Sequence, residues 1–345
     1  MQYLNDIKSL NLEELKVELK AEFKDIFAFR AEQIYSWLHE QNVESFDEMT
    51  NLSKELRENL KLKYEIRNCE IEQKLESQLD ETKKYLFKLN DGEFIESVLM
   101  KYKYGYTVCI STQVGCSMKC TFCASTIDGC KRNLTPSEML SQVYKIEKDN
   151  ENIKVSRVVL MGMGEPLDNF DNVLKFIELI TDKKGKNLSN RNVTISTCGI
   201  VPKIYELIKL NPQFTLSISL HAPNDEIRNK LMPVNKKWNV DELLKACKEY
   251  TKATNKRISF EYVLIDTVND DPEHAKELAR KLKNILCYVN LIPVNEVTEN
   301  NYIRSTDQKI QNFKKILDDA GITTTVRRTL GKDIEASCGQ LRRTR

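Results

Sequence analysis

The sequence has no apolar run that approaches the roughly 18–20 residues a membrane-spanning helix needs. Residues 1–15 include acidic side chains and no apolar core segment, so we expect no secretory signal peptide. Charge of one sign is also scarce, because 53 Lys and Arg nearly balance 51 Asp and Glu to a formal net charge of +2. These absences predict a cytoplasmic protein without membrane association, in which any nucleic-acid surface depends on local clusters of basic residues.

Glycine and proline are scarce, at 11 and 8 residues, whereas ten cysteines are many for an intracellular chain of 345 residues. Disulfide bonds are not the expected reason, because a reducing compartment keeps thiols free and a chain of this length builds its own core. Thiols clustered in a cytosolic enzyme indicate metal or redox chemistry, and five lie together here: Cys109, Cys116, Cys120, Cys123 and Cys130. Four others occupy apolar patterns and are predicted to be core residues: Cys69, Cys198, Cys247 and Cys287.

The order of patterns along the chain predicts an α/β architecture. Residues 1–65 have apolar side chains at helical spacing, and residues 66–105 change to short β-rich segments with a hairpin turn at 90–92. Further on, β-like and helical segments alternate, with strands expected at 156–161, 191–196, 214–220, 257–264, 287–292 and 323–327. Repeated β-then-α units imply an open or partial (β/α) barrel, whose chemistry lies at the C-terminal ends of its strands.

The motif C-x3-C-x2-C follows a predicted strand and consists of Cys116, Cys120 and Cys123. Three thiolates at this spacing can bind three irons of a cubane iron–sulfur cluster, which leaves the fourth iron open for S-adenosylmethionine. The alternative is a structural zinc site with Cys109 or Cys130 as the fourth ligand. Zinc motifs usually consist of two separated pairs of ligands, so the spacing favours the cluster.

A second motif, MGMGEP at residues 161–166, ends the next predicted strand. Glycines such as Gly164 let the backbone approach a ligand closely, and Glu165 can accept a hydrogen bond from a free amino group. A turn that simply requires glycine explains the same residues equally well. The motif therefore supports a cofactor site only together with the cysteine motif.

These two motifs belong to a set that occurs in a fixed order along nearly the whole chain. Besides C-x3-C-x2-C, the set consists of CISTQVGC at 109–116, MGMGEPL at 161–167, STCG at 196–199, SLHA at 219–222, NLIPVN at 290–295 and ASCGQL at 336–341. The sequence resembles the bacterial dual-specificity 23S ribosomal RNA and transfer RNA adenine-C2 methyltransferases of the radical S-adenosylmethionine superfamily.

The resemblance implies a partial (β/α) TIM-like barrel of the radical S-adenosylmethionine type. Its expected parts are a helical RNA-binding accessory domain at 1–65, a β-rich connector at 66–105, a barrel core at 106–330 and a tail at 331–345 with the methyl-accepting cysteine. It implies a [4Fe–4S] cluster on Cys116, Cys120 and Cys123. It places S-adenosylmethionine, two molecules per turnover, against Gly164, Glu165, Ser196, Ser219, Leu220, His221 and Asn295.

The resemblance also implies a route to adenine C2, a carbon too electron-poor for direct attack on a sulfonium methyl group. One S-adenosylmethionine would methylate Cys338, and a radical from a second would remove hydrogen from that S-methyl group. The methylene radical would add to C2 and form an RNA–protein adduct. Loss of the C2 proton, with Glu96 as acceptor, and attack by Cys109 would release the product and leave a Cys109–Cys338 disulfide, which is reduced again each turnover.

The partners expected from the resemblance are 23S rRNA and tRNA, and an electron donor such as flavodoxin or ferredoxin; the chain is expected to be a monomer. Two alternatives remain: an adenine-C8 23S rRNA methyltransferase that confers antibiotic resistance, and a non-catalytic RNA-binding module with structural zinc. Local basic groups predict an RNA phosphate surface; they are Lys131-Arg132, Lys183-Lys184 with Lys186, Lys236-Lys237, Arg327-Arg328, and Arg342-Arg343 with Arg345. Three tyrosines are candidates for base stacking: Tyr102, Tyr104 and Tyr106.

Overall fold

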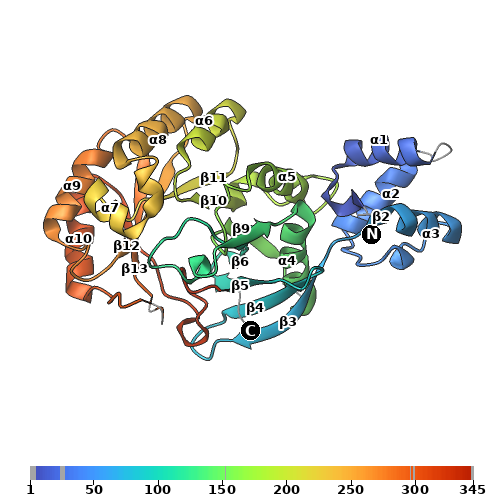
Figure 1. The fold of residues 1–345 in the computed structure, drawn as a ribbon, viewed down its shortest axis with the longest axis horizontal. Coiled ribbons are helices and arrows are strands. Elements are labelled where there is room, and N and C mark those ends of the chain that lie inside the picture. Colours follow the sequence, from blue (N-terminus) through green and yellow to red (C-terminus); the bar gives the residue numbers. More distant parts are fainter. Residues whose placement is uncertain (1–4, 24–27, 152, 296, 298–299, 343–345) are drawn as a thin grey trace.

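The computed structural model describes residues 5–23, 28–151, 153–295, 297 and 300–342. Figure 1 shows a small helical lobe formed by the N-terminal residues beside a larger α/β body. The lobe contains α1 (Leu12–Glu22), α2 (Ala28–His39) and α3 (Lys54–Lys63). The described ends of the lobe meet where β1 (Asn5–Asp6) pairs in parallel with β2 (Tyr64–Glu65).

Local capping explains where the lobe's helices begin. Asn11 and Glu14 form a reciprocal capping box at the start of α1, and Ser53 accepts a hydrogen bond from the backbone of Leu56 at the start of α3. Leu15 and Leu19 of α1 are almost completely buried. The lobe is thus held by an ordinary apolar core with polar helix ends.

The larger body is built on one sheet. Within the described residues it has ten strands in the order β14-β13-β12-β11-β10-β9-β6-β5-β4-β3. Strands β6 to β14 of this order pair in parallel, and β5, β4 and β3 extend the sheet as antiparallel strands. Their bounds are β3 (Cys69–Glu76), β4 (Lys83–Leu89), β5 (Phe94–Tyr102), β6 (Gly105–Cys109), β9 (Val155–Leu160), β10 (Val193–Thr197), β11 (Thr215–Ser219), β12 (Ile258–Leu264), β13 (Cys287–Pro293) and β14 (Thr324–Val326).

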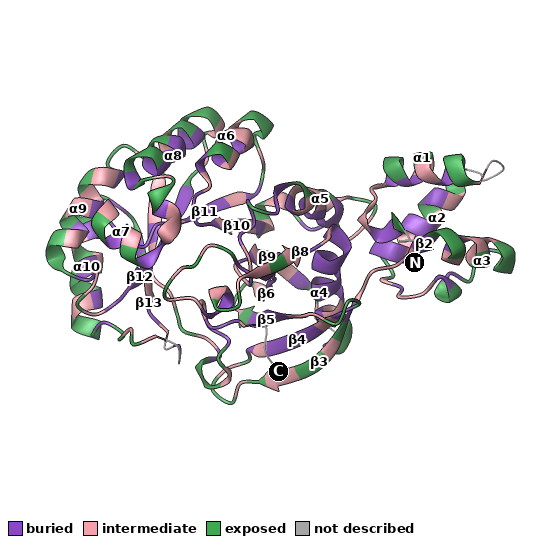
Figure 2. Cartoon of the chain, viewed as in Figure 1, coloured by how far each residue is buried: buried purple, intermediate pink, exposed green. Residues whose placement is uncertain are grey.

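Amphipathic helices cover one face of the parallel strands. They are α4 (Pro136–Asp149), α5 (Phe170–Thr181), α6 (Val201–Leu210), α7 (Asp225–Leu231), α8 (Val240–Thr254), α9 (Pro272–Leu282) and α10 (Asp307–Asp319). In α9, for example, Ala275, Leu278 and Leu282 are buried at helical spacing while the opposite face is solvated. Figure 2 shows buried residues along the strands and exposed residues on the outer helix faces. The predicted partial (β/α) barrel is confirmed.

The β-rich segment predicted at 66–105 is not a separate sheet. Its strands β3 to β5 continue the barrel sheet across residue 105, and the predicted turn at 90–92 joins β4 to β5 with Gly92 at φ +85°. The four-part division of the chain at 65, 105 and 330 stays a prediction. No helix among the described residues combines the length and apolarity needed to cross a bilayer.

We expect His39 to make the fold sensitive to acid. Its ring is buried against Tyr35, neither ring nitrogen has a hydrogen-bond partner, and burial lowers its pKa from 6.5 to about 3. Below pH 6.5 the unfolded chain therefore binds a proton at His39 that the folded chain does not bind. The folded state is most stable above pH 6.5, and it loses this stability as the pH falls. Between pH 7.5 and pH 5 this lowers the free energy of unfolding by about 2 kcal/mol. Urea unfolding at both pH values should show a smaller loss for His39→Leu; equal losses would contradict this account.

Candidate active site

A large cavity opens at the C-terminal ends of the parallel strands, with about 920 Å³ of empty space including its mouth. Most of the side chains that the sequence singled out line this cavity: Cys116, Cys120, Cys123, Gly164, Glu165, Ser196, Ser219, His221, Asn295 and Cys338. Leu220 does not line it; the side chain is fully buried, and the backbone accepts a hydrogen bond from Arg228. The fold thus brings together residues from five strand ends and the C-terminal tail.

The three cysteines of C-x3-C-x2-C lie on a loop between two short strands, β7 (Gln113–Gly115) and β8 (Cys130–Asn133), which pair as an antiparallel hairpin. Gly115 has φ +80°, and a side-chain Cβ there would lie 1.9 Å from the carbonyl oxygen of Gly129. Only glycine fits at this crossing. The hairpin therefore fixes both ends of the loop and aims its thiols into the cavity.

The donor set fits a group larger than a single metal ion. Among the described residues, no three His, Cys, Asp or Glu side chains converge closely enough to bind one ion. Of the thiols considered as a fourth zinc ligand, Cys109 lines a neighbouring pocket and Cys130 lines neither. Burial raises the pKa of all three motif thiols, that of Cys116 to about 12. Thiols lose their protons on binding a metal, and three thiols that line one cavity could hold three irons of a [4Fe–4S] cluster.

Glu165 is held rigidly at the cavity wall. Its carboxylate accepts hydrogen bonds from the backbone N–H of Cys198 at 2.7 Å and of Leu167 at 2.9 Å. Close approach of the MGMGEP loop to the neighbouring strand requires its glycines, since a Cβ at Gly162 would lie 2.6 Å from the oxygen of Ile110. Burial raises the pKa of Glu165, and the two N–H donors oppose that shift. Such a carboxylate is suited to an ammonium group in the cavity.

His221 contributes a neutral ring. It has φ +59°, and its Nδ1 accepts a hydrogen bond from the backbone of Val263 at 2.9 Å. Burial lowers its pKa to about 3. The ring of Phe122, from the cysteine loop, packs edge-on at 4.9 Å between centroids. His221 therefore shapes the cavity and does not act as an acid at neutral pH.

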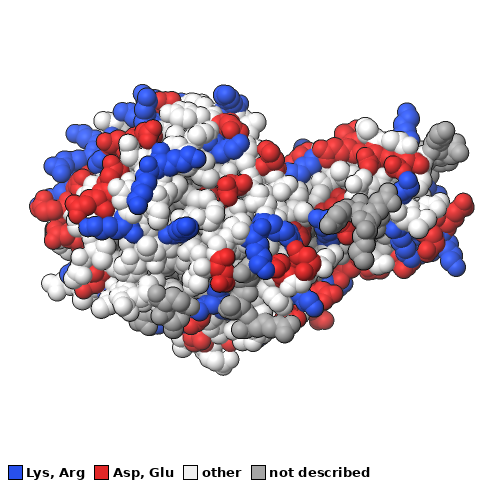
Figure 3. All heavy atoms as spheres, in the orientation of Figure 1, with Lys and Arg blue, Asp and Glu red and all other residues white. Residues whose placement is uncertain are grey.

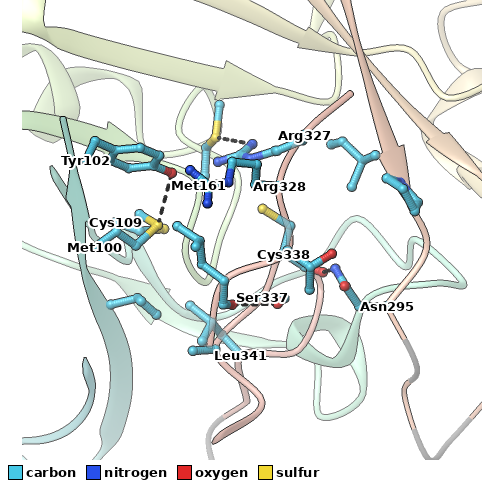
Figure 4. A pocket seen from close by; sticks show the side chains of 16 residues that line it. Met100, Tyr102, Cys109, Met161, Asn295, Arg327, Arg328, Ser337, Cys338 and Leu341 are labelled. Atoms are coloured by element: carbon cyan, nitrogen blue, oxygen red, sulfur yellow. Dashed lines mark hydrogen bonds between the residues drawn. The ribbon is translucent and has the colours of Figure 1, made fainter. Parts of the chain in front are cut away.

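Beside the cavity lies a second pocket that contains both remaining thiols of interest. Figure 4 shows Cys109, at the end of β6, and Cys338, on the tail, lining this pocket together with Arg327. Cys338, Arg327 and Asn295 also line the large cavity, so the two spaces adjoin. Burial raises the pKa of Cys109 to about 12; the Cys338 thiolate charge adds to the shift and Arg327 opposes it. We call this space the thiol pocket.

Three hydrogen bonds fix the tail that carries Cys338. Asn295 Nδ2 donates to the Cys338 carbonyl at 3.0 Å, the backbone N–H of Ala124 donates to Gly339 at 2.8 Å, and Ser125 Oγ donates to Leu341 at 2.7 Å. Ala124 and Ser125 directly follow the cysteine loop. The tail is therefore attached to the loop that bears the three motif cysteines.

Glu96 lies apart from both thiols. It is buried in a polar pocket where Lys84 Nζ lies 3.1 Å from its Oε1 and the backbone N–H of Arg342 donates to Oε2 at 2.8 Å. Burial raises its pKa, and Lys84 opposes that shift. In this arrangement Glu96 holds the tail, and its role as proton acceptor stays a prediction.

Sequence reasoning missed two charged residues. Glu261 lines the cavity floor, where its Oε1 accepts hydrogen bonds from Ser217, Ser259 and Asn290. The sequence contained a signal for Glu261, because it is the single charged residue of β12, whose other residues are apolar, serine or tyrosine. Arg228 is fully buried. Cys198 is a buried core residue, as predicted, and it also lines the cavity beside Glu165.

Some of the predicted basic groups are paired with carboxylates, and the RNA phosphate surface stays a prediction. Arg132 pairs with Asp91 and Glu138, Lys131 with Glu93, and Lys186 with Glu147. On the face shown in Figure 3, basic and acidic side chains are interspersed. Arg327 lines the thiol pocket instead of the surface; Arg343 and Arg345 lie outside the described residues.

One predicted stacking group has a defined geometry. The rings of Tyr102 and Tyr104 are parallel, with centroids 5.0 Å apart, and the guanidinium of Arg157 lies 4.2 Å from the Tyr104 centroid. Tyr102 also lines the thiol pocket. This stack thus extends from the pocket wall to the surface, where Tyr104 is exposed.

Comparisons with known proteins identify the family of the chain. Residues 110–279 match the Radical SAM superfamily, where SAM is S-adenosylmethionine, and residues 6–66 match the Ribosomal RNA large subunit methyltransferase N-terminal domain. The chain is 50% identical over 342 residues to the probable dual-specificity RNA methyltransferase RlmN of Clostridium novyi, covering 99% of this chain and 98% of that protein. Its identity to the protein of the same name from Lachnoclostridium phytofermentans is 53%, covering 98% and 94%.

A solved structure matches the whole fold. The radical SAM methyltransferase from Sphaerobacter thermophilus superposes with a TM-score of 0.92 at 39% identity, covering 98% of this chain and 99% of that one. Sequence, domain content and fold therefore agree over nearly the full length. The chain belongs to the RlmN family of dual-specificity RNA methyltransferases within the radical SAM superfamily.

Proposed function

We propose that the chain methylates C2 of an adenosine in 23S rRNA, at the peptidyl-transferase centre, and of the adenosine 3′ of the anticodon in certain tRNAs. The observation that carries the proposal is the meeting of Cys109 and Cys338. They are far apart in the sequence, yet they line one pocket next to the cavity of the three motif cysteines. A C2 methyl transfer through a protein thiol needs this juxtaposition, whereas an RNA-binding module with structural zinc does not.

Each side chain of the site has a defined task in this proposal. Cys116, Cys120 and Cys123 would hold the [4Fe–4S] cluster, and Glu165 would accept hydrogen bonds from the amino group of SAM. When bound, the cluster and SAM supply one-electron chemistry and the methyl group. Cys338 accepts that methyl group on its sulfur, and Asn295 orients the peptide that carries it.

The thiol pocket is suited to a flipped adenine. Val98, Met100 and Leu341 give it apolar walls, Tyr102 offers a ring, and Arg327 places a guanidinium beside the two thiols. A base must leave its stack to reach a buried site, and it is then held by stacking and by hydrogen bonds to its edges. Cys109 is positioned to attack the Cys338 sulfur and release the product, with the electron pair of the broken C–S bond passing to the methylated base and a Cys109–Cys338 disulfide left behind.

We further propose a cytoplasmic monomer that receives electrons from a small carrier such as flavodoxin or ferredoxin and binds RNA through its N-terminal lobe. The match of residues 6–66 supports the role of the lobe. The cytoplasmic location is proposed because the Cys109–Cys338 disulfide must be reduced in every turnover, which requires a reducing compartment.

Nucleoside mass spectrometry tests the proposal. Anaerobically reconstituted protein, SAM and a reductant are incubated with a 23S rRNA fragment or with tRNA, and the digested RNA is analysed. We expect 2-methyladenosine in both RNAs. Formation of 8-methyladenosine would favour the C8 enzyme, and absence of methylation despite an intact cluster would contradict the proposed activity.

A further inference from the structure

Arg228, on α7, is among the largest fully buried side chains of the protein, with 0% of its surface exposed. Its guanidinium donates to the carbonyls of Leu220 at 3.0 Å, Cys198 at 2.7 Å and Ser219 at 3.2 Å. Nη1 donates to Asn235 at 3.0 Å. The donors therefore tie together the ends of β10 and β11, whose residues Cys198 and Ser219 line the cavity.

No carboxylate of the described residues pairs with this guanidinium within 4.0 Å. Asp225 is linked to it only through Asn235, whose Nδ2 donates to Asp225 at 2.9 Å. Carbonyl and amide oxygens satisfy the N–H groups but leave a full positive charge in the interior. A buried charge is costly unless an opposite charge balances it.

Thiolates formed by the cysteine loop when it holds its cluster would supply the missing counter-charge. Burial lowers the pKa of Arg228, and negative charge on Cys198 or Cys120, were either thiol ionised, would oppose that shift. Cys120 packs against a hydrophobic cluster that includes Ile227 and Leu231 of α7, and the backbone N–H of the next residue, Thr121, donates to the carbonyl of Leu231 at 3.0 Å. The helix that carries Arg228 thus contacts the loop that carries the cluster ligands.

We propose that Arg228 is the positioning residue that balances the negative charge of the three cluster thiolates and favours addition of an electron at this site; this rests on the proposed function, because it requires the cluster. A fixed positive charge in a low-dielectric interior stabilises the more negative, reduced state. Its hydrogen bonds hold Ser219 and Cys198 in the cavity wall, but its charge sets how readily the site accepts the electron.

Two substitutions separate charge from hydrogen bonding. Arg228→Gln removes the charge and keeps amide donors, whereas Arg228→Lys keeps the charge and loses the planar fork. We expect a potentiometric titration of the reconstituted cluster, followed by electron paramagnetic resonance, to give a more negative potential for Arg228→Gln. The expected loss is roughly tenfold in the one-electron reduction equilibrium, about 59 mV. Arg228→Lys should retain most of the wild-type potential.

The matched control is Lys230→Gln, which removes a positive charge from the same helix at an exposed position paired with Glu226. Solvent screens that charge, so we expect no shift. Equal potentials for wild type and Arg228→Gln, or equal shifts for Gln and Lys, would overturn the inference. Iron and sulfide content and circular dichroism are measured on each variant, so that a misfolded variant is recognised and Arg228→Lys alone then decides. A wild-type protein that binds no cluster would instead contradict the proposed function.

Discussion

Replacing Cys338 with alanine is expected to lower formation of methylated adenosine by roughly a thousandfold or more. The reason is that adenine C2 does not attack a sulfonium methyl group directly, so the reaction has no route without a thiol that first accepts the methyl group. The tail is held through backbone carbonyls: that of Cys338 accepts a hydrogen bond from Asn295, and that of Gly339 accepts one from Ala124 of the cysteine loop. An alanine side chain leaves both bonds intact. Mass spectrometry of digested RNA and of the intact protein checks both the product and the S-methyl group.

The control for this prediction is Cys130→Ala. Cys130 belongs to the same thiol-rich region but lines neither the cavity nor the thiol pocket. We expect it to retain activity near the wild-type level. Substantial methylation by the Cys338→Ala protein would mean that another group accepts the methyl or that transfer to RNA is direct.

Replacing Cys109 with alanine is expected to make the covalent RNA–protein intermediate accumulate, whereas Cys338→Ala prevents its formation. The Cys338 thiol can still be methylated and joined to the base, but no neighbouring thiol remains to break the carbon–sulfur bond. Cys109 is buried and lines the thiol pocket together with Cys338. Among the described residues, no other cysteine lines this pocket. We expect most of the RNA bound in the first turnover to stay covalently attached to the protein, visible as a slower band on a denaturing gel.

Two controls make this result specific. Nuclease treatment should remove the slower band, and a Cys109→Ala, Cys338→Ala double variant should form none, because the attachment point is gone. Normal multiple turnover by Cys109→Ala, with free product and no adduct, would show that Cys109 does not resolve the intermediate.

Much of the fold was predictable because its elements carry regular patterns. The strand expected at 287–292 is β13 (Cys287–Pro293), and that expected at 257–264 is β12 (Ile258–Leu264). Both follow turn or polar residues and alternate with amphipathic helices, which is the signal of a β/α repeat. The hairpin of β7 and β8 was not predicted, because strands of three and four residues carry too little periodicity.

The site was predictable where a residue belongs to a motif and unpredictable where it acts by burial. Cys116 and Glu165 belong to short motifs that indicate binding of an iron–sulfur cluster and of a cofactor amino group. Arg228 sits in a charged helix, and only the three-dimensional packing of α7 against the cysteine loop buries it. Glu96 shows the converse: the family resemblance alone implied its role, and the structure adds that it contacts Lys84 and the tail.

The most direct test of the central claim is the fate of a fully deuterated methyl group. SAM with a methyl group that carries three deuterons is supplied with tRNA, and the mass of the product nucleoside is measured by mass spectrometry. Transfer through Cys338 removes one deuterium when the methylene radical forms and returns a proton from solvent, so we predict a methyl group that keeps two deuterons. A product that keeps all three would contradict the account, because it would mean that the methyl group passes intact to the base.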